Sequence, residues 1–116
     1  MGNFIKAGKS VEFQDGAMKK VPVKGREILV ARVEGNYYAA DNRCPHMGGD
    51  LSLGKLEGTI VTCPRHSSRF DLKDGKLIRW MKGSGLFYTV GKVLKSPRPL
   101  PVCNVKVEGD DVLVEI

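Results

Sequence analysis

Residues 44–66, CPHMGGDLSLGKLEGTIVTCPRH, decide how this chain folds. The stretch contains both histidines of the protein and two of its three cysteines. They are arranged as Cys44-x-His46 and, after residues 47–62, as Cys63-x-x-His66. Thiolate and imidazole groups are the side-chain ligands that soft and borderline transition metals prefer. We therefore expect two loops that meet over one metal centre.

The residues beside these four suit loops of restricted shape. Pro45 and Pro64 each follow a cysteine, where the proline ring stiffens the backbone and removes an N–H donor. Gly48 and Gly49 follow the first pair and lack a Cβ, which lets the backbone approach a bulky inorganic group. Scattered core cysteines and surface histidines would not be expected to repeat the same arrangement twice.

A tetrahedral zinc site is the main alternative, because two cysteines and two histidines are a common zinc set. Zinc sites more often pair like ligands, as Cys-x2-Cys with His-x3-5-His. Here each loop supplies one ligand of each kind. This mixed pattern favours two metal ions, with the thiolates on one and the imidazoles on the other. On the residues alone a zinc-stabilised structural module stays open, and it would be colourless.

The rest of the sequence predicts an all-β fold. Short apolar segments, many of them alternating, recur at a spacing of about ten residues and are separated by glycine turns. Gly35-Asn36 is a hairpin signal between two of them. Such a pattern is typical of an antiparallel β-sandwich or barrel. The predicted strands lie within 10–14, 19–24, 26–33, 36–41, 59–63, 69–72, 76–78, 102–107 and 112–116.

One segment departs from the strand pattern and predicts a short helix near 85–95. Ser84 is a suitable N-cap and Pro97 ends the segment. Its apolar side chains fall on one helical face: Leu86, Phe87, Val90, Val93 and Leu94.

Bulk properties narrow the function classes. A chain of 116 residues fits a single domain. Its net charge of +6 is spread along the sequence without a run of four basic residues, so we expect no nucleic-acid binding and favour an acidic protein partner. No apolar run is long enough to cross a bilayer, and the first residues lack an apolar signal-peptide core. We therefore expect no membrane association and a cytoplasmic location.

CPH at 44–46 together with CPRHSSRFD at 63–71 resembles the Rieske iron–sulfur motif, in particular that of Rieske-type ferredoxins. The resemblance continues through PRPLPV and the closing hairpin VKVEGDDVLVEI. It implies one [2Fe-2S] cluster per chain, with Cys44 and Cys63 on one iron and His46 and His66 on the other. It also implies a cluster-binding subdomain at about 42–72, with base sheets at about 1–41 and 73–116.

The resemblance carries an expectation about the reduction potential. His-ligated clusters lie at about −150 to +300 mV, against about −400 mV for plant-type ferredoxins, because two thiolates leave the cluster less negative than four. High-potential members have a disulfide whose cysteines would fall at Gly49 and Arg65, and a tyrosine at the position of Phe70. Their absence favours a low potential. Ser68 stands where those members place a serine that donates a hydrogen bond to a cluster sulfide, and such a donor would raise the potential. The alternative is that Ser68 faces solvent.

The function implied is that of a one-electron carrier that has no catalytic site of its own. It would pass electrons from a reductase to an oxygenase or another redox enzyme. The alternative is a Rieske small subunit of a stable oxidoreductase complex. The cluster environment would include Pro45, Met47, Gly48 and Pro64. We expect Arg43, Arg65 and Arg69 to dock the partner, or else to be ordinary surface charges. Cys103 is expected to be a buried thiol outside the site.

Overall fold

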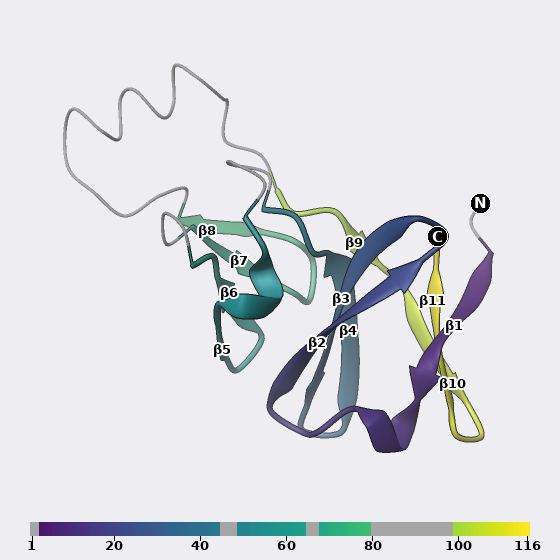
Figure 1. Cartoon of the computed structure of the whole chain (residues 1–116). Helices are drawn as coiled ribbons and strands as arrows, with labels where there is room; N and C mark the ends of the chain where they lie inside the picture. Colours follow the sequence, from purple (N-terminus) through teal and green to yellow (C-terminus); the bar gives the residue numbers. More distant parts are fainter. Residues whose placement is uncertain (1–2, 45–48, 65–67, 80–98) are drawn as a thin grey trace, which may run out of the picture.

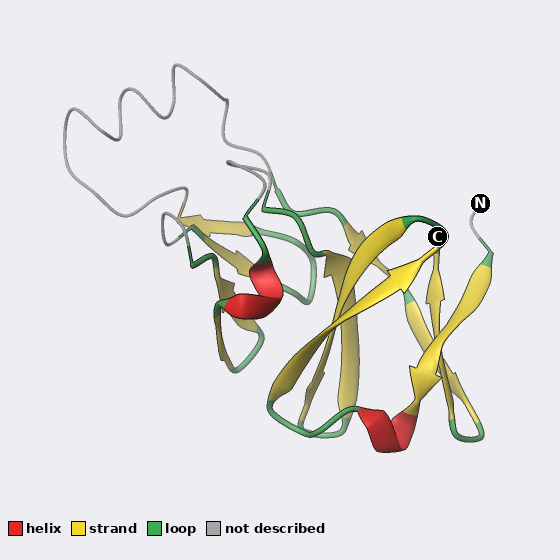
Figure 2. Cartoon of the chain, in the orientation of Figure 1, coloured by secondary structure: helices red, strands yellow, loops and turns green. Residues whose placement is uncertain are grey.

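The computed structural model describes residues 3–44, 49–64, 68–79 and 99–116. The helix predicted near 85–95 lies outside these residues. So do six residues of the predicted site, which are Pro45, His46, Met47, Gly48, Arg65 and His66. The described part consists of strands, loops and two 3-10 turns (Figure 2). The all-β prediction is confirmed.

The described strands form three antiparallel sheets (Figure 1). The first has the order β1-β11-β10, the second β2-β3-β4-β9 and the third β5-β6-β7-β8. The bounds are β1 Phe4–Lys9, β2 Ala17–Val23, β3 Arg26–Val33, β4 Asn36–Asp41, β5 Lys55–Glu57, β6 Ile60–Thr62, β7 Arg69–Asp71, β8 Leu77–Arg79, β9 Val102–Cys103, β10 Val105–Glu108 and β11 Asp111–Glu115. The 3-10 turns are η1 Ser10–Glu12 and η2 Leu51–Leu53.

Strand β3 lies between two hydrophobic cores. Side chains alternate across a strand, and both faces of β3 are buried: Ile28 and Val30 enter one core, whereas Leu29 and Ala31 enter the other. The core of Ile28 joins the first two sheets through Phe13, Val21, Val23, Ala39, Val112 and Val114. The core of Leu29, which we call the site core, joins the second sheet to the third through Ala40, Cys44, Leu51, Val61, Cys63, Phe70, Leu72 and Leu100.

The hairpin of β3 and β4 has the bounds that the sequence predicts, with its turn one residue earlier. Val33 pairs with Asn36, so the two-residue turn is Glu34-Gly35 rather than Gly35-Asn36. Both turn residues have positive φ, 52° and 80°, as a type I′ turn requires.

The strand predicted at 10–14 is wrong. Ser10–Glu12 forms η1, and the first strand precedes it as β1. The Glu12 carboxylate accepts a hydrogen bond from the Lys9 N–H at 2.7 Å, which stabilises a turn at this point. Phe13 is 4% exposed and Val11 is 85% exposed. The apparent alternation therefore comes from one core residue and one solvated residue.

Candidate metal centre

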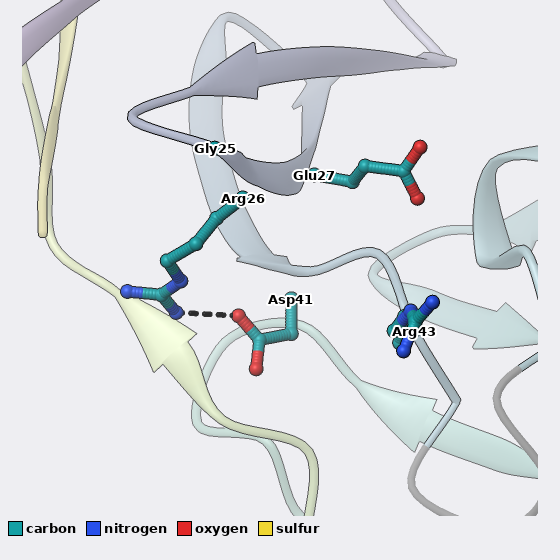
Figure 3. A pocket seen from close by; sticks show the side chains of 5 residues that line it. All are labelled: Gly25, Arg26, Glu27, Asp41 and Arg43. Carbon is teal, nitrogen blue, oxygen red and sulfur yellow. Dashed lines mark hydrogen bonds and ion pairs between the residues drawn. The ribbon is translucent and has the colours of Figure 1, made fainter.

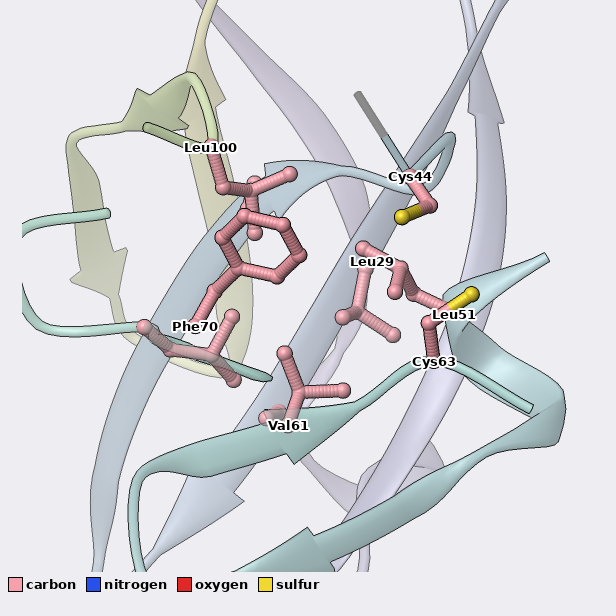
Figure 4. Packing of buried hydrophobic residues seen from close by; sticks show 10 residues of the cluster. Leu29, Cys44, Leu51, Val61, Cys63, Phe70 and Leu100 are labelled. Atoms are coloured by element: carbon pink, nitrogen blue, oxygen red, sulfur yellow. The ribbon is translucent and has the colours of Figure 1, made fainter. Parts of the chain in front are cut away.

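Cys44 and Cys63 lie in the same buried cluster although they come from different parts of the chain. Their exposed fractions are 3% and 2%. Figure 4 shows both side chains at one end of the site core, with Phe70 and Leu100 at the other. The fold therefore brings together the two cysteines that the sequence assigns to one iron.

Each of the two cysteines begins a loop, and the two loops are closed by equivalent backbone hydrogen bonds. The N–H of Cys44 donates to the carbonyl of Gly49 at 2.8 Å, and the N–H of Cys63 donates to the carbonyl of Ser68 at 2.8 Å. In both cases the acceptor lies five residues after the cysteine. Each loop thus has the same span and contains the histidine that the sequence assigns as a ligand. Gly49, which stands where a loop disulfide would need a cysteine, is buried at the end of the first loop.

Ser68 is fully buried, so the alternative that it faces solvent is wrong. Within the described part of the chain, its Oγ has no hydrogen-bond partner. Buried hydroxyls are normally hydrogen-bonded, because leaving one unpaired costs about 1–3 kcal/mol. An acceptor that is not part of the polypeptide, such as an inorganic sulfide of a bound cluster, would satisfy it. Two observations therefore fit a bound iron–sulfur cluster: the cysteine thiols that meet in one core and the buried Ser68 hydroxyl that has no acceptor among the described residues.

The second loop extends a hairpin. Val61 pairs with Phe70 and Thr62 pairs with Arg69, so the ladder of β6 and β7 reaches the residues next to Cys63 and Ser68. Phe70 is fully buried in the site core, in the place where the resemblance puts a tyrosine in high-potential proteins. Its ring fills space there and brings no hydroxyl.

The first loop is closed by polar side chains that belong to no metal-binding motif in the sequence. Asn42 is fully buried, and its Nδ2 donates to Oδ1 of Asp50 at 2.7 Å. Ser52 donates to the same oxygen through its N–H at 3.1 Å and its Oγ at 2.5 Å. The available signal was the spacing Asp50-x-Ser52, which is typical of a capping turn.

The Asp50 carboxylate is held in its charged form. Burial alone would raise its pKa, but hydrogen bonds from Ser52 and Asn42 and the ammonium of Lys20 outweigh this effect and hold the pKa at about 2. The Lys20 Nζ lies 3.2 Å from Oδ2 of Asp50. At neutral pH the carboxylate therefore acts as an acceptor for every one of these donors.

The arginines beside the loops differ in their surroundings. Arg43 is exposed and lines an open cavity with Gly25, Arg26, Glu27 and Asp41 (Figure 3). Within that cavity, Arg26 forms an ion pair with Asp41 at 2.6 Å. Arg69 is half-buried and lies 3.6 Å from Glu57 on its own sheet. Arg43 therefore remains a candidate for partner docking, whereas Arg69 already has a carboxylate neighbour.

Cys103 lies apart from the other two cysteines. It is in β9, pairs with Ala39 of β4, and packs against the core between the first two sheets. The side chain is half-buried rather than buried, and burial raises the pKa of its thiol. The position agrees with the expectation that Cys103 is outside the metal site.

Residues 3–104 match the Rieske [2Fe-2S] domain. The chain belongs to the Rieske [2Fe-2S] family. The naphthalene 1,2-dioxygenase system ferredoxin component of Pseudomonas aeruginosa is 32% identical over 113 residues, covering 97% of this Rieske protein and 95% of that relative. A Ralstonia ferredoxin component of naphthalene 1,2-dioxygenase/salicylate 5-hydroxylase systems is 41% identical over 76 residues, covering 66% of this chain and 73% of the relative.

Solved structures agree with the family in fold. The Sphingomonas yanoikuyae B1 ferredoxin has a TM-score of 0.77 at 23% identity and covers 98% of this chain and 99% of its own. A chain in the complex of reduced oxygenase and oxidised ferredoxin in carbazole 1,9a-dioxygenase has a TM-score of 0.76 at 26% identity, covering 97% of this Rieske protein and 92% of that chain.

These relationships determine the class of function. The relatives named above are ferredoxin components, and this Rieske protein is accordingly an electron carrier and not itself an enzyme. Membership of the Rieske [2Fe-2S] family supports an iron–sulfur cluster rather than the zinc alternative. Among the described residues, no helix is long and apolar enough to cross a bilayer.

Proposed function

We propose that this Rieske ferredoxin binds one [2Fe-2S] cluster per chain and carries one electron at a time from a reductase to the oxygenase of a dioxygenase system. Cys44 and Cys63 would hold one iron, and His46 and His66 the other. The observation that carries this assignment is the burial of both cysteines in one core, on two loops with the same closure. When bound, the cluster supplies a site that accepts and releases a single electron.

The protein groups around the thiolates have opposing effects on the potential. The apolar side chains of the site core surround Cys44 and Cys63 and disfavour the extra negative charge of the reduced state, since that charge is poorly solvated there. The buried Ser68 hydroxyl favours the reduced state, because a donor aimed at sulfur stabilises added charge. We propose a potential in the lower half of the Rieske range, with Ser68 raising it.

The first experiment is a visible absorption and EPR spectrum with metal and sulfide analysis of the purified protein. We expect a red-brown protein with about two irons and two labile sulfides per chain, and an EPR signal that appears on reduction by one electron. A colourless protein with a single zinc and no labile sulfide would contradict the proposal.

The delivery partner is proposed from the relatives, which are components of dioxygenase systems, and from the ferredoxin seen with an oxygenase in the carbazole system. We propose that the carrier acts in the cytoplasm and docks on an acidic face of its partner. Its net charge of +6 and the exposed Arg43 support this electrostatic complementarity.

Replacing Arg43 by glutamate should slow electron delivery and weaken its salt dependence. Charge complementarity raises association rates, and salt at 0.1 M screens exposed charges that lie more than about 10 Å apart. We expect the rate of oxygenase reduction by wild type to fall as salt rises, and the Arg43→Glu rate to fall less steeply. Lys106→Glu, on β10 of the first sheet and outside the cavity that Arg43 lines, is the charge-matched control. Equal salt slopes for wild type and Arg43→Glu would argue against docking through Arg43.

A further inference from the structure

The two cysteine loops are supported in different ways. The second loop follows directly on the β6–β7 ladder, whose last pair, Thr62 and Arg69, adjoins it. The first loop connects the end of β4 to η2, and in the described structure its flanks share one isolated bridge, between Arg43 and Asp50. Such a loop needs another source of rigidity if both loops are to bind one cluster.

We propose that Asn42 and Asp50 are positioning residues that clamp the neck of the first loop and so fix it for cluster binding. This inference rests on the proposed function. The clamp consists of Asn42, Asp50 and Ser52. It lies outside the proposed ligand set and acts on the loop that carries Cys44 and His46.

The clamp closes the neck from both sides. Asn42 precedes the loop, and Asp50 and Ser52 follow it. Asn42 donates to Asp50 at 2.7 Å, and its Oδ1 accepts the Ser52 N–H at 2.9 Å. The backbone adds a hydrogen bond from the Leu51 N–H to the Asn42 carbonyl at 2.9 Å. The buried amide of Asn42 thus uses both its donor and its acceptor across the neck, which makes each hydrogen bond costly to lose.

The clamp is tied to the rest of the molecule at two further points. Lys20 of β2 reaches Oδ2 of Asp50 at 3.2 Å. After η2, Gly54 packs closely on the end of β6 and the start of the second loop, where a Cβ would overlap the Thr62 carbonyl oxygen and lie 3.2 Å from Cδ of Pro64. The clamp therefore fixes the first loop relative to β2 and, through η2, relative to the second loop.

The test compares Asp50→Ala, Asp50→Asn and Asp41→Ala in the cluster-loaded protein. Asp50→Ala removes the acceptor for Asn42, Ser52 and Lys20. Asp50→Asn keeps an oxygen for Asn42 and Ser52 and replaces the oxygen that faces Lys20 by an amide NH2, which cannot accept from it. Asp41→Ala is the matched control, since Asp41 accepts from Arg26 at 2.6 Å but does not close the neck.

We expect iron release to a coloured chelator to accelerate by roughly tenfold or more in Asp50→Ala, the fold-change that corresponds to about 1.4 kcal/mol. Asp50→Asn should release iron at close to the wild-type rate, and Asp41→Ala at the wild-type rate. The EPR lines of the reduced Asp50→Ala protein should broaden, because the first loop would no longer be held in one position. Deuterium uptake should rise in a peptide covering 43–54 and stay unchanged in one covering 60–71.

The outcomes separate this inference from the proposed function. A wild-type protein without iron and sulfide overturns the proposed function. The clamp is overturned if wild type holds the cluster and Asp50→Ala shows wild-type EPR lines and wild-type iron release. The two proteins are compared equally far below their Tm. This holds even if the Tm of the variant falls. Wild-type deuterium uptake in the 43–54 peptide of Asp50→Ala would overturn it as well.

Discussion

Replacing Cys63 by alanine is expected to remove the red-brown colour, the iron and the reduced-state EPR signal together. The thiolate would be one of two protein ligands on its iron, and at 2% exposure the position is shielded from the bulk water that could replace it. Alanine is small and apolar, so the site core should tolerate it at a cost of about 1–2 kcal/mol. Circular dichroism checks that the variant still folds, and metal analysis measures the loss.

The third cysteine supplies the matched control. Cys103→Ala changes the same side chain in the other core, so it should keep full colour and full iron content at a similar cost in stability. Cys44→Ala should behave like Cys63→Ala, because both cysteines belong to the site core. If Cys63→Ala retained two irons, or if Cys103→Ala lost them, the ligand assignment would be wrong.

The fold was predictable where local rules and burial agree. The bounds of β3 and β4 follow from short apolar runs on either side of a turn signal, although the turn itself begins at Glu34. The alternation at 10–14 misled, since alternation does not tell whether Val11 meets a core or solvent. Strands β1 and β5 were missed. Strand β1 pairs with β11 from the other end of the chain, and Lys55–Glu57 contains a single apolar residue.

The sequence points only to side chains whose chemistry is distinctive, and of the four predicted ligands the described structure places the two cysteines in one cluster. Cysteine and histidine are strong signals because few other roles use them in this spacing. Asn42 and Ser52 have no such signature, since buried and exposed polar residues look alike in a sequence. Their role depends on the burial of Asn42 and on Asp50 accepting from both. Ser68 was an intermediate case, where the motif suggested a donor and only the fold could place it away from water.

Replacing Ser68 by alanine should lower the reduction potential. The hydroxyl is fully buried and has no acceptor among the described residues, so the bound cluster is the natural acceptor. A donor to sulfur is stronger in the reduced state, which carries one more negative charge. If the difference is about 1–2 kcal/mol, the potential falls by roughly 40–90 mV for one electron.

Ser68→Cys should lower the reduction potential by a smaller amount, because a thiol has nearly the same shape as a hydroxyl and is a weaker hydrogen-bond donor. We expect its potential to lie between those of wild type and Ser68→Ala, measured by redox titration monitored by absorption. The fully buried Phe70 brings no hydroxyl of its own to the site core, so it cannot replace the lost hydrogen bond. Equal potentials for wild type and Ser68→Ala would mean that the hydroxyl meets no cluster atom. The potential would then be governed by the apolar side chains around the two thiolates.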